Sequence, residues 1–125
     1  MIFLYLTEIY FLSNNNLIEH KHEWKKVCEI AGNQNSSKTF IVEDLSEYSE
    51  VLLTCGLAVI YQTGRILGST IIPIKMWNAC NSDYSSGYFQ CAYNGTTYCA
   101  GVTRLSDTSV KLYANTKTLT GLYVR

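Results

Sequence analysis

Short apolar runs dominate the chain from residue 24 onward, and clusters of Gly, Asn, Ser, Asp and Thr separate them. Apolar runs of this length, with turn residues every eight residues or so, are typical of antiparallel strands in a sandwich or barrel. The pattern predicts strands at 24–30, 38–42, 51–61, 66–77, 87–93, 97–104, 109–114 and 118–124. We therefore expect an all-β domain, an antiparallel β-sandwich of jelly-roll-like character.

Two of the predicted strands carry features that place them within a sheet. The run at 51–61 is apolar nearly throughout, which suits a central strand buried on both faces. Pro73 has no amide hydrogen for a sheet ladder, so the strand at 66–77 is expected at an edge or a bulge. The polar stretch 43–50 separates the strands predicted at 24–30 and 38–42 from this pair. It is long enough for one helical turn.

The stretch GYFQCAYNGTTYCAGV (87–102) predicts a hairpin that turns at its Asn-Gly pair. A two-residue turn would place Cys91 opposite Tyr98, whereas a three-residue turn would place it opposite Cys99. A disulfide therefore depends on one residue of loop length, and the sequence leaves both registers open.

The first 23 residues differ from the rest and are predicted to be a connector. The segment 1–12 has ten apolar residues, which is too short a run to span a bilayer and lacks the features of a signal peptide. Either it packs on the domain or on a partner chain, or it is the ragged start of a longer protein. A short helix is plausible near 16–23. The expected organisation is a connector at 1–23 and one β-sandwich head domain at 24–125.

Composition narrows the possible functions. Ten basic and ten acidic side chains give a formal net charge of zero, which argues against a nucleic-acid binder. Five cysteines without a C-x-x-C spacing indicate mostly reduced, structural thiols, as expected for folding in a cytoplasm.

The sequence offers no clear catalytic or metal-binding set. The only histidines, His20 and His22, lie in the connector, and the only aspartates after residue 51, Asp83 and Asp107, lie in separate loops. We expect a non-enzymatic protein without a cofactor. On a strand, His20 and His22 would share a face, so three chains around an axis could offer six nitrogens to one ion. An exposed polar connector is the simpler interpretation of the pair.

The loop that leads into the strand at 87–93 is the best candidate for recognition. Carbohydrate sites combine an aromatic face with Asp and Asn oxygens that accept hydrogen bonds from hydroxyl groups, and this loop has that mixture. Tyrosines are also ordinary strand residues that bury a ring and keep the hydroxyl wet. The candidate ligand-binding residues are Trp77, Asn78, Asn81, Asp83, Tyr84 and Tyr88.

Three stretches of the chain resemble one known family. They are EWKKVCEIAG (23–32), LSEYSEVLLTCGL (45–57) and GVTRLSDTSVKLYANTKTLTGLYVR (101–125). Because of these stretches, the chain from Trp24 to Arg125 resembles a C-terminal receptor-binding head domain. Such domains occur in tail fibre and baseplate proteins of phages and prophages from Gram-positive and gut bacteria.

The resemblance implies a function and a set of partners. Such heads are usually homotrimeric β-sandwiches that hold saccharides of the host bacterial surface without breaking bonds. It implies a location in the phage tail of the virion after synthesis in the bacterial cytoplasm, with the N-terminal segment contacting other tail proteins. No nucleic-acid partner and no membrane insertion are expected. A purely structural tail or baseplate protein, or a small host-encoded lectin or adhesin, are the alternatives.

Overall fold

A computed structural model of the protein describes residues 23–58, 65–77 and 86–125. Two four-stranded antiparallel sheets pack face to face, so the predicted all-β sandwich is confirmed. The strands are β1 (Lys25–Ala31), β2 (Ser36–Ile41), β3 (Glu50–Leu57), β4 (Ile66–Pro73), β5 (Ser86–Tyr93), β6 (Thr96–Ser106), β7 (Ser109–Ala114) and β8 (Thr118–Val124).

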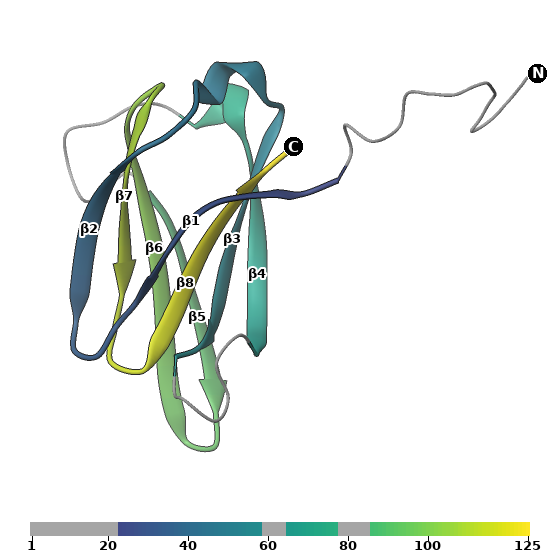
Figure 1. The fold of residues 1–125 in the computed structure, drawn as a ribbon. Coiled ribbons are helices and arrows are strands. Elements are labelled where there is room, and N and C mark those ends of the chain that lie inside the picture. The colour runs from purple at the N-terminus through teal and green to yellow at the C-terminus, as the bar shows by residue number, and fades with distance from the viewer. Residues whose placement is uncertain (1–22, 59–64, 78–85) are drawn as a thin grey trace, which may run out of the picture.

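Sheet I has the strand order β1-β8-β3-β4, and sheet II has the order β2-β7-β6-β5. Strands β5, β6 and β7 form a meander within sheet II, whereas β1 and β2 belong to different sheets. Figure 1 shows the carboxyl terminus at the upper end of the sandwich and the β5–β6 hairpin at the opposite end. We call the end that carries the carboxyl terminus the upper end.

The core lies between the sheets and follows the alternation of the strands. In β3, Val51, Leu53 and Cys55 are fully buried and face sheet II, and Leu57 continues this row. Strand β3 lies between β8 and β4, as expected of a central strand. From β6 and β7, the side chains that meet it include Val102 and Leu112.

Strand β4 is the edge of sheet I, and Pro73 is its last residue, which confirms the prediction for this proline. The predicted strand at 66–77 was too long, because residues Ile74–Met76 form the 3-10 turn η4. At this point the amide of Ile74 donates to the carbonyl of Ser49, and the amide of Trp77 donates to that of Ile74. These bonds turn the chain across the upper end of the sandwich.

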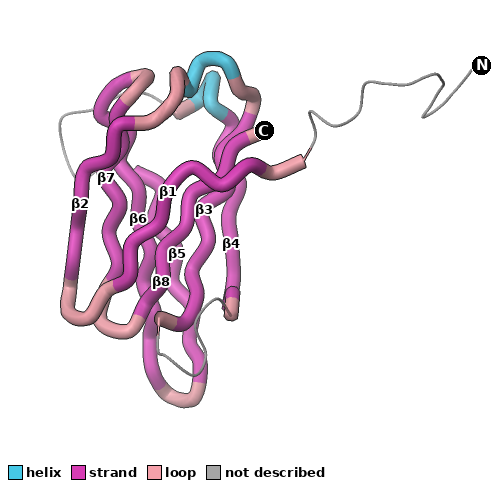
Figure 2. The backbone as a smooth tube through the Cα atoms, viewed as in Figure 1, coloured by secondary structure: helices cyan, strands magenta, loops and turns pink. Residues whose placement is uncertain are grey.

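A second 3-10 turn, η2 (Leu45–Glu47), lies within the polar stretch where a helical turn was expected. The two turns lie together at the upper end, where Figure 2 colours them cyan. They are the only helical elements of the described residues, and neither has the length or the apolar character needed to cross a membrane.

The β5–β6 hairpin has the two-residue turn. Asn94 and Gly95 have φ values of 49° and 75°, and Cys91 pairs with Tyr98. Cys99 therefore faces away from Cys91, on the outer side of sheet II. Among the described cysteines, all four thiols are free. The predictions for the segment 1–22, including its short helix, lie outside the described residues.

Candidate functional site

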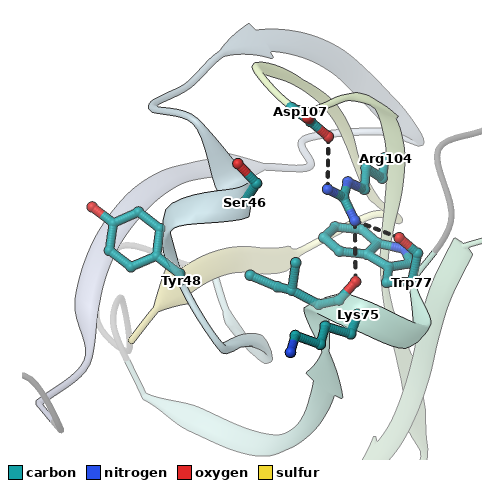
Figure 3. Close-up of a pocket in the computed structure, with 7 residues that line it drawn as sticks. Ser46, Tyr48, Lys75, Trp77, Arg104 and Asp107 are labelled. Carbon is teal, nitrogen blue, oxygen red and sulfur yellow. Dashed lines mark hydrogen bonds and ion pairs between the residues drawn. The ribbon is translucent and has the colours of Figure 1, made fainter.

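A pocket of about 470 Å³ opens at the upper end of the sandwich, between the turns η2 and η4. Figure 3 shows the turn η2 on one side, the turn η4 below, and the β6–β7 turn above. We call it the end pocket. Its lining residues are Ser46, Tyr48, Ile74, Lys75, Trp77, Arg104 and Asp107.

Arg104 holds the wall of the end pocket together. Its Nη1 donates hydrogen bonds to the carbonyl oxygens of Ile74 at 3.2 Å and Trp77 at 2.5 Å. Its Nη2 donates to Oδ1 of Asp107 at 2.8 Å. The residue is 7% exposed, so one cation on β6 satisfies two carbonyls of η4 and its flank inside the protein. This arrangement fixes the position at which the chain leaves Trp77.

Trp77 forms the other part of this wall. Its side chain is 5% exposed and belongs to the core, and the guanidinium of Arg104 lies 5.7 Å from the centre of its ring. The ring therefore shapes the pocket from inside and has little surface for a sugar to stack on. Among the described residues, the indole Nε1 and the Nε of Arg104 are buried donors that have no hydrogen-bond partner. A buried donor of this kind costs about 1–3 kcal/mol, so an acceptor that reached it would be stabilising.

The turn η2 supplies the opposite side of the pocket and is fixed by Asp44. The carboxylate of Asp44 accepts hydrogen bonds from the amide of Ser46 at 3.0 Å and from its hydroxyl at 2.7 Å. The same two bonds, the hydroxyl's first, lower the pKa of Asp44. Asp44 therefore stays ionised as the N-cap of η2, and Ser46 keeps its position at the rim.

Tyr48 presents its ring to the pocket while its hydroxyl points away from Trp77 (Figure 3). The hydroxyl donates to Glu43, whose carboxylate also lies 2.7 Å from the ammonium of Lys25. The hydrogen bonds from Lys25 and then Tyr48 lower the pKa of Glu43. This exposed network fixes the aromatic ring beside the pocket without contributing a charge to it.

The end pocket has the chemistry of a binding site for a polar ligand. It offers the Lys75 ammonium, the Ser46 hydroxyl and the Asp107 carboxylate around an apolar floor of Ile74 and the indole. Its described lining contains neither histidine nor cysteine. Within 23–58, 65–77 and 86–125, no group of three His, Cys, Asp or Glu side chains could hold a metal ion.

The structure separates the two predicted ligand-binding residues that it describes. Trp77 lies in the core at the upper end, whereas Tyr88 lies on the outer face of sheet II and is 57% exposed. The other predicted residues lie outside the described part of the chain, and their roles stay predictions. They are Asn78, Asn81, Asp83, Tyr84 and the metal candidates His20 and His22.

Apart from Trp77, sequence reasoning missed the residues that line the end pocket. Ser46, Lys75 and Asp107 come from three separate turns, and no spacing in the sequence connects them. Arg104 could have been found from the sequence, because alternation along β6 from Tyr98 through Val102 puts its side chain on the core face. A cation on a core face is expected to have buried partners. Here those partners are the carbonyls of η4.

Comparison of the chain with protein-family models, with curated proteins and with solved structures found no match.

Proposed function

We propose that this protein is a non-enzymatic receptor-binding module of a phage tail that attaches to saccharides on the host bacterial surface. The observation that carries the proposal is the end pocket, in which hydroxyl, ammonium and carboxylate groups surround an apolar floor. Sugars offer the same combination of hydroxyl groups and apolar C–H faces. The stretches that resemble tail fibre and baseplate heads supply the biological setting of the proposal.

The proposed assembly is a homotrimer in the virion. Single sugar contacts are weak, and several copies on one tail raise the overall avidity by a factor of about 10²–10⁴ when they engage one surface. A site at the end of a sandwich suits this use, because turns there can face a cell surface while the sheets pack elsewhere. In this assembly the N-terminal segment contacts the other tail proteins.

The test is binding of the full chain to purified cell-wall polysaccharides from Gram-positive and gut bacteria, by biolayer interferometry. We expect saturable binding to at least one polysaccharide, weakened by Lys75→Met, because Lys75 is an exposed cation on the rim of the pocket. Lys38→Met removes an exposed lysine of sheet II outside the pocket and is the matched control. Binding to none of the polysaccharides would contradict the proposal.

A purely structural tail or baseplate role is the second candidate, and one feature of sheet I favours it. Leu52, Ile71 and Tyr123 lie in register across β4, β3 and β8 on the outer face, and Ile71 is 46% exposed. Such an apolar row suits packing against another copy of the chain. Light scattering after size-exclusion chromatography tests the trimer, and a trimer that binds no polysaccharide would favour the structural role.

A further inference from the structure

The outer face of sheet II carries a tyrosine that the end pocket does not use. Tyr88, Gly101 and Tyr113 lie side by side on β5, β6 and β7. Their neighbours in each strand belong to the core, so alternation turns all three away from sheet I. Gln90 and Cys99 form the next outward pair along β5 and β6. We call these five residues the Tyr88 platform.

The ring of Tyr88 lies beside Gly101, its partner on β6. A Cβ atom at Gly101 would be 3.6 Å from Cδ1 of Tyr88 and 3.5 Å from Cβ of Tyr113. At the other end of the ring, Gln90 Nε2 donates a hydrogen bond to the Tyr88 hydroxyl at 3.1 Å and contacts Cys99 Sγ at 3.6 Å. The ring is therefore held against the sheet at both its edge and its hydroxyl, as aromatic residues beside a strand glycine often are.

Burial on this face agrees with that arrangement. Cys99 is only 8% exposed although it points away from the core, whereas Tyr88 is 57% exposed. The hydrogen bond with Cys99 is also the main reason that the pKa of Tyr88 is raised. The Tyr88 hydroxyl and the Gln90 amide thus lie next to the buried thiol, while most of the Tyr88 side chain is open to solvent. Among the described elements, none packs over it.

We propose that the Tyr88 platform is a second saccharide-binding site, in which the apolar face of a neutral pyranose stacks on the open side of the Tyr88 ring. The Gln90 amide and the Tyr113 hydroxyl border the ring and are suited to hydrogen bonds with the sugar's hydroxyl groups. The inference rests on the proposed function for its ligand class. It adds a separate site on a different face of the same domain.

The charge of the platform favours this ligand over others that stack on aromatic rings, and the outward-facing Lys111 of β7 lies one row away, opposite Thr103. Tyr88, Gln90, Cys99, Gly101 and Tyr113 carry no formal charge at neutral pH, in a chain whose net charge is zero. A nucleobase would bring a phosphate that needs Lys or Arg beside the ring. A cation would gain from a nearby carboxylate, and none belongs to the platform. An uncharged sugar requires neither.

The probes that test the platform are the methyl glycosides of glucose, galactose, N-acetylglucosamine and rhamnose, added to the ¹⁵N-labelled full chain. We expect at least one glycoside to shift the side-chain amide signals of Gln90 and the backbone signal of Gly101 in NMR spectra. Tyr88→Ala is expected to weaken this binding by about 2- to 13-fold, since an aromatic stacking contact is worth about 0.5–1.5 kcal/mol. Tyr88→Phe keeps the ring and is expected to keep most of the binding.

Tyr123→Ala is the matched control. Tyr123 lies beside Gly121 on the outer face of sheet I, where a Cβ at the glycine would be 3.2 Å from Cε1 of the ring. Removing this tyrosine should leave glycoside binding unchanged. The platform would be refuted if none of the four glycosides shifted its signals, or if Tyr88→Ala bound them as well as the unmodified chain.

The platform and the proposed function fail separately. If cell-wall polysaccharide binds and Lys75→Met weakens it while no glycoside reaches the platform, the second site is wrong and the proposed function stands. If glycosides bind at the platform but no cell-wall polysaccharide binds, the platform stands and attachment to bacterial surfaces is wrong.

Discussion

Trp77 and Tyr88 are two aromatic residues on either side of the segment 78–85, and the sandwich gives them opposite environments. Trp77 is 5% exposed, and Arg104 holds its carbonyl and covers its ring. Tyr88 is 57% exposed and lies on the outer face of sheet II across a glycine. The difference shows that an aromatic residue near a polar loop is a candidate for recognition only when its ring reaches solvent. Trp77 forms part of the wall of the end pocket, whereas the exposed ring of Tyr88 is accessible to a ligand.

The largest expected effect of this difference is on stability. Trp77→Ala should lower the free energy of unfolding by about 3–5 kcal/mol, because it removes a buried ring from the core. Tyr88→Ala should cost less than about 1 kcal/mol, the range of a cross-strand surface contact. Urea denaturation followed by circular dichroism measures both. Equal losses for the two variants would contradict the contrast between a buried and a surface ring.

The second expected effect is a loss of stability when Arg104, which donates a hydrogen bond to the carbonyl of Trp77, is replaced. Arg104→Met leaves the carbonyls of Ile74 and Trp77 without their donor, and each buried unsatisfied acceptor costs about 1–3 kcal/mol. Asp107→Asn is the control, because its amide oxygen can still accept the hydrogen bond from Arg104 and both carbonyls keep their donor. Thermal unfolding compares them. A stable Arg104→Met variant would show that the cation does not hold this end together.

A smaller effect on stability is expected at the Asn94-Gly95 turn, which fixes the register of β6 against β5, the strand that carries Tyr88. Gly95 has a φ of 75° and open space around it, so Gly95→Ala has only a conformational cost, about 1–2 kcal/mol. Gly101→Ala is the comparison, because a methyl group there meets its neighbours at ordinary contact distances. Its backbone needs no positive φ. Denaturant midpoints should therefore fall more for Gly95→Ala, and the reverse order would contradict the assigned turn.

The smallest effect is chemical and needs no loss of stability. Because the Tyr88 side chain lies next to the buried Cys99, Tyr88→Ala should make this thiol react faster with iodoacetamide at pH 8, as peptide mass spectrometry can measure. Cys55 is the internal control, since burial and then the neighbouring Cys91 raise its pKa to about 12. It should stay unreactive in both proteins. An unchanged rate at Cys99 would mean that the Tyr88 side chain does not shield it.

The sandwich could be predicted from the sequence because each strand is marked by an apolar run and by the turn residues at its ends. Alternation along β5 placed Tyr88 on the opposite face from Cys91, whereas the length of the turn at Asn94-Gly95 stayed open until the structure showed two residues. The end pocket could not be predicted in this way, because Ser46, Lys75 and Asp107 meet only after the two sheets pack. The burial of Trp77 depended on the turn η4, where the hydrogen bond from Ile74 to Ser49 redirects a chain that alternation alone would continue as a strand.

We propose that this domain binds saccharides through the end pocket and the Tyr88 platform. The most direct test of this proposal is an NMR titration of the ¹⁵N-labelled full chain with fragments of bacterial cell-wall polysaccharide. The account predicts shifts that cluster at Ser46, Lys75 and the turns around them, and at Tyr88, Gln90 and Gly101 on sheet II. Shifts confined to the apolar row of sheet I, or the absence of any shift, would contradict it.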